Sequence, residues 1–194
     1  MIDKNQLRQC EVIKMEPLVA NDKLFVKSGI TVLSALAGTG KSTYMRAKMD
    51  EFEKNGYSCI YFNADLADIK NSYLLPDNIS DFFNIIGSGD NNDVVIIDSL
   101  KMFCAMYNLD VMDNSDMIRL FLGLREITSK NHLSVIFIHH SFKEKRLKNA
   151  EEHLFGARAI EEQSDSVFLF DVSMNMKIIK NRLGLIRDSI FTVE

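Results

Sequence analysis

The clearest chemical signal of the sequence lies at residues 35–42, which read ALAGTGKS. Gly38 and Gly40 let the backbone turn so that consecutive N–H groups point at one anion. Lys41 has the reach to contact the terminal phosphates of a nucleotide, and the Ser42 hydroxyl suits Mg²⁺. The pattern G-x-x-x-x-G-K-S/T has Ala35 at its first position, where a small side chain in an extended backbone is expected to be tolerated. The expected phosphate-binding loop comprises Ala35, Leu36, Ala37, Gly38, Thr39, Gly40, Lys41, Ser42 and Thr43.

Two carboxylates stand at the ends of other apolar stretches. Residues 93–98 read DVVIID and end in Asp98, and residues 59–65 read CIYFNAD and end in Asp65. A carboxylate directly after an apolar strand can hold Mg²⁺ opposite a phosphate-loop hydroxyl, and this pairing with Ser42 is the interpretation we favour for Asp98. The alternative for either residue is a solvated carboxylate in a turn.

Two histidines end a further apolar run, VIFIHH at residues 135–140. At the tip of a strand beside a phosphate loop, His139 or His140 can sense a γ-phosphate and pass its loss to the following loop. Side chains alternate along a strand, so only one of the two can face a nucleotide, and which one stays open. The alternative is a purely structural role.

The elements that must position these groups are short, continuous apolar runs separated by helical patterns. The runs are residues 30–36, 59–62, 94–97, 133–138 and 166–170. Such runs are typical of strands buried on both faces of a parallel sheet that helices cover. After residue 170, closely spaced strands at 176–180 and 188–194 flank a turn at Leu183 and Gly184. The sequence therefore predicts an α/β fold, a mostly parallel twisted sheet with flanking helices and a C-terminal antiparallel edge hairpin.

Helical spacing of apolar residues marks two of the connections. Met45, Met49 and Phe52 form one stripe, and Gly56 offers a stop after it. A second stripe comprises Met117, Leu120, Phe121 and Leu124. Asp113, Asn114 and Ser115 are the capping candidates before it.

Composition bounds the class of protein. The 194 residues are 46% hydrophobic and carry a formal net charge of −4, which suits one domain and excludes a wholly basic nucleic-acid coat. The cysteines Cys10, Cys59 and Cys104 are widely spaced and suit neither a disulfide scaffold nor a zinc knuckle. We expect a cytoplasmic protein with no membrane segment. We expect a single domain, 1–194, with 1–27 as an N-terminal approach or oligomerisation segment and 28–194 as the core.

Together, these motifs resemble the RecA/DnaB branch of P-loop ATPases, and most of all the plasmid RepA-type hexameric replicative helicases. The resemblance spans about residues 28–190. It implies a RecA-like P-loop NTPase core that uses ATP and Mg²⁺. In this branch the acid at the position of Asp65 is a glutamate that orients or deprotonates the attacking water. Aspartate is one methylene shorter, which leaves slow hydrolysis open. Residues 98–103 also resemble the family, although Lys101 there has a surface role as its alternative.

Residues 178–184, IIKNRLG, resemble the K-x-R-x-G hairpin of DnaB-type motors. In that family the Lys and Arg reach the γ-phosphate held by the neighbouring subunit, and this makes hydrolysis depend on assembly. The resemblance assigns that role to Lys180 and Arg182 and implies a ring homo-oligomer, a hexamer in this family. The alternative is a pair of exposed cations that protect an edge strand from aggregation.

Residues 141–158 lie where this family places a mobile DNA-contacting loop. Cations outnumber carboxylates there by a small margin, and such a run is usually a solvated loop. In a ring, the fields of six copies would add in one channel. The candidate contacts with single-stranded DNA are Lys143, Lys145, Arg146 and Lys148.

Three functions follow from these observations. The first is a ring-forming single-stranded-DNA translocase or replicative-helicase-like motor in DNA replication or recombination, with replication proteins as further partners. The second is a nucleotide-dependent regulatory or assembly ATPase without unwinding activity, which Asp65 and the acidic net charge favour. The third, a small-molecule kinase, needs an Arg-rich lid, and the one short basic cluster is interrupted by Glu144.

Overall fold

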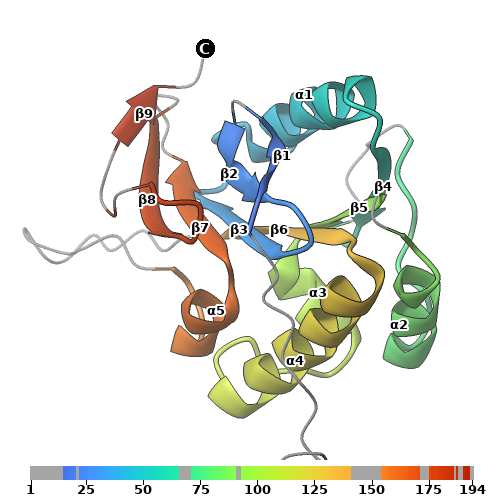
Figure 1. The fold of residues 1–194 in the computed structure, drawn as a ribbon. Helices are drawn as coiled ribbons and strands as arrows, with labels where there is room; N and C mark the ends of the chain where they lie inside the picture. Colours follow the sequence, from blue (N-terminus) through green and yellow to red (C-terminus); the bar gives the residue numbers. More distant parts are fainter. Residues whose placement is uncertain are drawn as a thin grey trace, which may run out of the picture.

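A seven-stranded sheet runs through the centre of the computed structural model (Figure 1), in the order β4-β5-β6-β3-β7-β8-β9. The model describes residues 15–20, 22–65, 71–90, 93–140, 154–170, 175–185, 187 and 190–192. The parallel strands are β4 (Ser58–Asn63), β5 (Asp93–Asp98), β6 (Ser134–His140), β3 (Ile30–Ala35) and β7 (Ser166–Phe170). Strands β8 (Asn175–Asn181) and β9 (Ile190–Thr192) continue the sheet in the antiparallel direction. The predicted fold class and its edge hairpin are confirmed.

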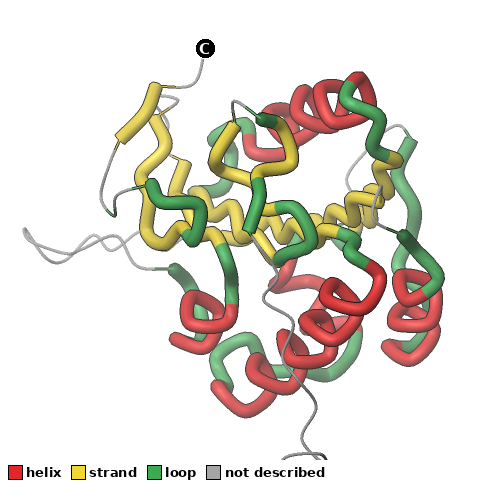
Figure 2. The backbone as a smooth tube through the Cα atoms, in the orientation of Figure 1, coloured by secondary structure: helices red, strands yellow, loops and turns green. Residues whose placement is uncertain are grey.

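Helices cover both faces of this sheet, as Figure 2 shows. One face carries α1 (Lys41–Lys54) together with a separate antiparallel pair, β1 (Pro17–Val19) and β2 (Asp22–Val26). The other face carries α2 (Ile79–Gly87), α3 (Leu100–Met106), α4 (Asn114–Asn131) and α5 (Arg158–Gln163). Because both faces are covered, the central strands are buried along their length, which explains their continuous apolar sequence.

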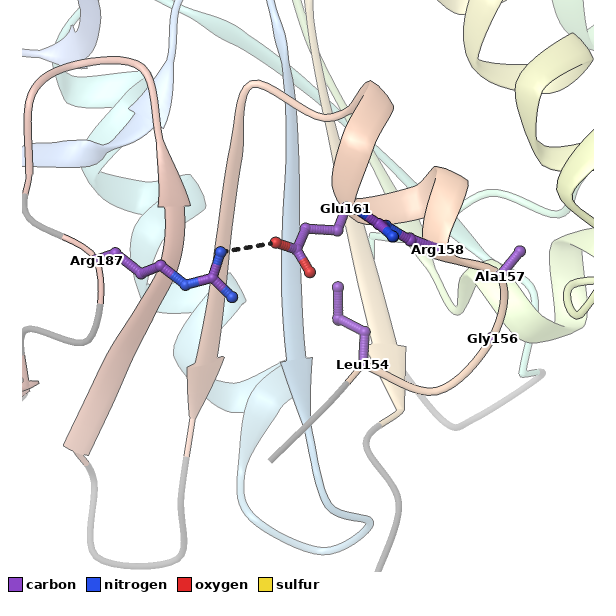
Figure 3. Close-up of a pocket in the computed structure, with 6 residues that line it drawn as sticks. All are labelled: Leu154, Gly156, Ala157, Arg158, Glu161 and Arg187. Carbon is purple, nitrogen blue, oxygen red and sulfur yellow. Dashed lines mark hydrogen bonds and ion pairs between the residues drawn. The ribbon is translucent and has the colours of Figure 1, made fainter. Parts of the chain in front are cut away.

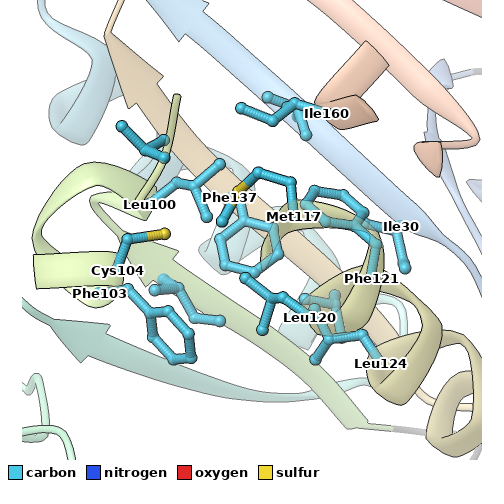
Figure 4. Packing of buried hydrophobic residues seen from close by; sticks show 14 of the residues in the cluster. Ile30, Leu100, Phe103, Cys104, Met117, Leu120, Phe121, Leu124, Phe137 and Ile160 are labelled. Atoms are coloured by element: carbon cyan, nitrogen blue, oxygen red, sulfur yellow. The ribbon is translucent and has the colours of Figure 1, made fainter. Parts of the chain in front are cut away.

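Two hydrophobic clusters hold these layers together, one on each face. Figure 4 shows the larger one, in which Phe103 of α3 and Phe121 of α4 pack against Phe137 of β6. On the opposite face, Phe25 of β2 makes edge-on contacts with Phe52 of α1 at 5.3 Å and with Phe168 of β7 at 5.4 Å. Burial of these large side chains supplies most of the driving force for docking the helices.

The helix ends agree with the local signals in the sequence. Asp113 caps α4, where its carboxylate accepts a hydrogen bond from the Asp116 N–H at 2.9 Å. Gly56 follows α1 with a positive φ of 88°, as expected of the stop. In the described ranges no helix combines the length and apolar character that a membrane span requires.

Strands β1 and β2 lie inside the N-terminal segment for which the sequence indicated no strand. Both strands are short, and Phe25 is buried by contacts with residues distant in the sequence, such as Phe52, so no local pattern marks them. Residues 17–19 and 22–26 therefore contribute to the packed structure through this pair.

Candidate functional site

The loop between β3 and α1 has the backbone geometry of a phosphate-binding turn. Gly38 and Gly40 have φ values of 78° and 86°, which side chains other than glycine rarely adopt. A Cβ atom at either position would meet no atom within 4 Å, so the backbone conformation, and not crowding, is what requires glycine. Gly40 immediately precedes α1, whose first N–H groups have no intrahelical acceptor and carry a partial positive charge. Ala35 ends β3 in a buried, extended position, as expected of a small residue there.

Lys41 lies over this loop, with only 7% of the residue exposed. Its Nζ donates to the carbonyl oxygens of Ala35 at 3.3 Å and Leu36 at 2.9 Å. Burial lowers the pKa of Lys41, and the nearby carboxylates of Asp98 and Asp65 oppose that shift. The ammonium group therefore lies against the backbone of the loop, held by two of its carbonyl oxygens.

Asp98 at the end of β5 is buried and faces the first turn of α1. The Ser42 hydroxyl donates to Oδ2 of Asp98 at 2.7 Å, and the Tyr61 hydroxyl donates to the same oxygen at 2.5 Å. The pKa of Tyr61 is raised by burial and by the Asp98 charge, so the phenol stays a donor. Tyr61 was not singled out in the sequence, although its polar tip within an apolar strand was a usable signal.

Ser42 and Asp98 together fit a magnesium ion. Both present oxygen donors, which Mg²⁺ prefers, and Mg²⁺ in nucleotide sites is commonly held by one or two protein ligands together with phosphate oxygens. Among the described residues, no cluster of three or more His, Cys, Asp or Glu side chains forms an all-protein metal cage. The structure thus brings the two predicted metal ligands into contact, and their role toward magnesium stays a prediction.

Asp65 lies beside Asp98, at the end of the neighbouring strand β4. The Ala64 and Asp65 N–H groups both donate to the Asp98 carbonyl oxygen, at 2.6 and 3.1 Å. The Ser99 hydroxyl donates to Oδ1 of Asp65 at 2.8 Å. The nearby His140 ring is the largest cause that lowers the pKa of Asp65, and the Ser99 hydrogen bond adds to it against the effect of burial. Asp65 is therefore an ionised carboxylate at neutral pH. Ser99 is a second residue that the sequence did not single out.

His140 is the histidine that faces the phosphate loop. Its Nδ1 lies 3.5 Å from Nζ of Lys41, and its Nε2 lies 3.8 Å from Oδ2 of Asp65. An ammonium group can only donate, so Nδ1 is the acceptor in that contact, and Nε2 is the ring nitrogen that carries a proton toward Asp65. His140 thus bridges the phosphate-binding lysine and the neighbouring carboxylate.

His139 is fully buried, and its Nε2 contacts the carbonyl oxygen of Phe155. Burial lowers the pKa of His139 to about 4, so the ring is neutral. The structure separates the two histidines as strand alternation requires, and it places only His140 against Lys41.

Lys180 and Arg182 lie near the amino ends of the parallel strands, whereas the phosphate loop follows the carboxyl end of β3. Strand β8 runs antiparallel to β7 and pairs its end with Ser166, which starts β7. Strand β7 runs parallel to β3. The two ends of β3 are separated by roughly 17 Å at about 3.3 Å per residue. One chain therefore does not bring Lys180 or Arg182 to its own loop.

Both cations have partners within the chain. Lys180 Nζ donates to the carbonyl oxygens of Glu161 and Glu162 in the last turn of α5, at 2.9 and 2.7 Å. Arg182 donates to the buried Asp165 carboxylate at 2.7 Å. Arg125 of α4 donates to both oxygens of Asp165 at 2.8 and 2.7 Å.

The predicted DNA contacts Lys143, Lys145, Arg146 and Lys148 lie outside the described residues. Lys101, on α3, is exposed, and its Nζ lies 5.6 Å from the centre of the Phe155 ring. This cation–π contact agrees with the surface alternative for Lys101.

A cavity of about 420 Å³ lies between the start of α5 and Arg187. Figure 3 shows Arg187 pointing toward Glu161, with their side chains 3.3 Å apart. Arg158 in the same wall pairs with Glu162 at 2.8 Å. Carboxylates of the same chain thus already pair with both arginines in this wall.

Comparison with known proteins finds the fold and no sequence family. No family model matches the chain, and no curated protein matches its sequence. Among solved structures, 468 chains match. One is the ATPase domain of G40P, with a TM-score of 0.64 and 10% identity over 87% of this chain and 86% of that chain. At this identity the likeness shows the fold alone: the chain has a RecA/DnaB-like fold, and nothing in the match singles out the RepA type.

Proposed function

We propose that this chain binds ATP with Mg²⁺ at the loop between β3 and α1 and hydrolyses it. The observation that carries the proposal is the meeting of three strand ends at one edge of the sheet. Lys41 and Ser42 follow β3, Asp98 ends β5, and His140 ends β6. Lys41 contacts His140 directly, and Ser42 donates a hydrogen bond to Asp98. Ligands of open parallel sheets bind at the carboxyl ends of the strands, and this is that edge.

The chain's own groups divide the work of binding. Backbone N–H groups at the start of α1 and the Lys41 ammonium would hold the phosphates by charge and hydrogen bonds. Ser42 and Asp98 would hold the magnesium ion, which supplies charge neutralisation on the β- and γ-phosphates when bound. Tyr61 keeps the Asp98 carboxylate in place through its hydroxyl.

Asp65 is the group we assign to the attacking water. Its carboxylate is ionised, fixed by Ser99 and adjacent to His140, so it can accept a proton or orient a water molecule. His140 would report the presence of the γ-phosphate, because it contacts both Lys41 and Asp65. His139 would help to pass the loss of the γ-phosphate on to the segment that follows β6, through its contact with the Phe155 carbonyl oxygen.

The finer form of the proposal is a ring-forming motor that moves on single-stranded DNA in replication or recombination. Lys180 and Arg182 lie far from their own loop, so a role at a γ-phosphate requires a second copy of the chain. This supports a homo-oligomer, proposed as a hexamer, in which the basic residues of 141–158 line the channel. The fold shared with the ATPase domain of G40P supports the ATPase part of this proposal.

A second candidate is a nucleotide-dependent regulatory or assembly ATPase without unwinding activity. Asp65 is one methylene shorter than the glutamate of the family it resembles. Lys180 and Arg182 are already engaged by backbone carbonyls and by Asp165. Both observations favour slow turnover.

One experiment separates the two. The rate of ATP hydrolysis and the particle mass are measured together, with and without a short single strand of DNA. The motor proposal expects a nucleotide-dependent oligomer whose turnover rises on addition of the single strand. Turnover that neither assembly nor DNA changes contradicts the motor and leaves the regulatory ATPase.

A further inference from the structure

A cavity of about 600 Å³ opens beside the phosphate loop, between α1 and the outer edge of β4. It begins at Thr43, in the first turn of α1, and its wall includes Tyr61. Tyr61 is the residue whose hydroxyl contacts Asp98, so the cavity adjoins the proposed magnesium ligands directly. Its volume lies within the range of small-molecule sites, roughly 300–1,000 Å³.

Tyr73 supplies an aromatic face at the outer wall of this cavity. Its backbone is fixed on both sides: its N–H donates to the Tyr61 carbonyl at 2.8 Å, and its carbonyl accepts from the Asn63 N–H at 2.9 Å. The residue nevertheless stays 61% exposed. A large ring on an immobilised backbone is a preorganised surface for a planar ligand, because little conformational freedom is lost on stacking.

The opposite wall is one face of α1 with polar groups available to a ligand. Arg46, Asp50 and Glu53 follow one another at turn spacing along the helix and line the cavity. Among the described residues, none of these three side chains has a hydrogen-bond or ion-pair partner. They offer a donor and two acceptors, which match the hydroxyls and nitrogens of a nucleoside.

We infer that this cavity is the site of the nucleoside half of the bound nucleotide, with the base stacked on Tyr73. The inference rests on the proposed function, since it needs the triphosphate to lie in the loop. The phosphate end is fixed by Lys41 and Asp98, and a chain leaving the loop past the first turn of α1 reaches the cavity at Thr43. The structure thus assigns recognition of the base to the same chain that binds the phosphates.

The experiment compares two ligands that share the phosphates and differ in the nucleoside. Binding of ATP and of inorganic tripolyphosphate, each with Mg²⁺, is measured by calorimetry for the wild-type chain, Tyr73→Ala and Tyr73→Phe. We expect Tyr73→Ala to raise the Kd for ATP at least about fivefold and to leave the Kd for tripolyphosphate unchanged, as expected for loss of a base–aromatic stack. Tyr73→Phe keeps the ring and is expected to bind ATP as the wild type does.

Two further variants control for position. Leu74→Ala changes the next residue, which is 71% exposed and does not line the cavity, and it is expected to change neither Kd. Ala47→Leu adds bulk to the cavity from an exposed position of α1, and it is expected to raise the Kd for ATP but not for tripolyphosphate. This variant tests the cavity independently of Tyr73→Ala.

The outcomes distinguish this inference from the proposed function. If Tyr73→Ala and Ala47→Leu leave the ATP affinity unchanged, or weaken ATP and tripolyphosphate equally, the nucleoside assignment is wrong while nucleotide binding stands. If the wild-type chain binds neither ligand, or if Lys41→Ala leaves both affinities unchanged, the proposed function fails and the nucleoside site fails with it.

Discussion

Asp65 and His140 form the part of the site that decides between binding and turnover. The carboxylate accepts from Ser99, and the imidazole lies between it and Lys41. The two side chains that contact the Asp65 carboxylate, Ser99 and His140, lie outside the phosphate loop, and only His140 reaches the loop, through Lys41. Removing the negative charge at Asp65 therefore separates hydrolysis from nucleotide affinity.

Asp65→Asn is expected to lower the rate of ATP hydrolysis by about 10²-fold or more, because an amide cannot accept the proton of the attacking water. The Kd for ATP is expected to stay within a fewfold of the wild type. Steady-state hydrolysis and calorimetry check the two parts. The control Asp65→Glu keeps the charge and is expected to retain hydrolysis. Unchanged turnover in Asp65→Asn would remove Asp65 from the reaction.

His139 makes the stability of the fold sensitive to acid. Burial holds its folded pKa at about 4, against about 6.5 for an unperturbed imidazole. Between these values the unfolded chain binds a proton that the folded chain excludes, so unfolding becomes easier as the pH falls. The contribution is complete near neutral pH and diminishes from about pH 6.5 downward.

We expect His139→Gln to remove about 3 kcal/mol of the wild-type loss in unfolding free energy between pH 7 and pH 4. Glutamine can still donate to the Phe155 carbonyl, which is the contact of His139 Nε2. Urea denaturation at the two pH values measures the difference. His132→Asn changes an exposed histidine at the end of α4 and should keep the wild-type acid dependence. Equal acid sensitivity of His139→Gln and the wild type would show that His139 is protonated in the fold.

At this scale the sequence predicted the groups that act through their own type and spacing. Lys41, Ser42 and Asp98 were identified because a glycine turn and two apolar strands fix where they must lie. Tyr61 and Ser99 were missed because their roles exist only through partners on other strands. The choice between His139 and His140 needed the direction of the side chains on β6, which a strand pattern alone leaves open.

Among the elements, the central strands and the long helices were the predictable ones. Burial on both faces imposes an unbroken apolar run, and this is visible in the sequence of β3, β5 and β6. Helix α3 spans seven residues, too few for a periodic stripe to be distinguished. Strands β1 and β2 are stabilised by Phe25, whose partners Phe52 and Phe168 lie on distant segments.

The cap of α4 offers a test of an element on its own. Asp113→Ala removes the acceptor for the Asp116 N–H and is expected to lower the free energy of unfolding by about 1 kcal/mol. Chemical denaturation measures it. Glu126→Ala, on an exposed position of the same helix, is expected to change stability by less than about 0.5 kcal/mol. An equal effect of both substitutions would show that the cap does not stabilise the helix.

For the whole molecule, the open question is whether one copy acts on the nucleotide of another. Arg182 shares the buried Asp165 carboxylate with Arg125, and the Ile30 N–H donates to the same carboxylate at 2.8 Å. This group of contacts ties β8, α4 and β3 together at the edge opposite the loop. A structural role and a role in trans predict different effects for the two arginines.

Arg182→Ala is expected to leave ATP binding intact and to lower hydrolysis at least about 10-fold in the assembled sample, because the transition-state charge loses its partner. Arg125→Ala removes the other, partly buried ion-pair partner of Asp165. It is expected to lower the stability of the fold and to leave turnover per folded molecule unchanged. Hydrolysis and thermal melting of both variants give the comparison. Unchanged turnover in Arg182→Ala, with the oligomer intact, would leave only the structural role.

The account depends most directly on binding of a triphosphate at the turn between β3 and α1. The measurement is a calorimetric titration of the wild-type chain and Lys41→Ala with ATP·Mg²⁺, with Lys48→Ala as the matched control. Lys48 lies on the same helix and pairs with Asp22 at 2.7 Å, away from the loop. We expect saturable binding to the wild type and Lys48→Ala, and loss of about 100-fold or more in affinity for Lys41→Ala with its melting temperature retained. Absence of binding to the wild type, or equal affinity of Lys41→Ala, would contradict the account.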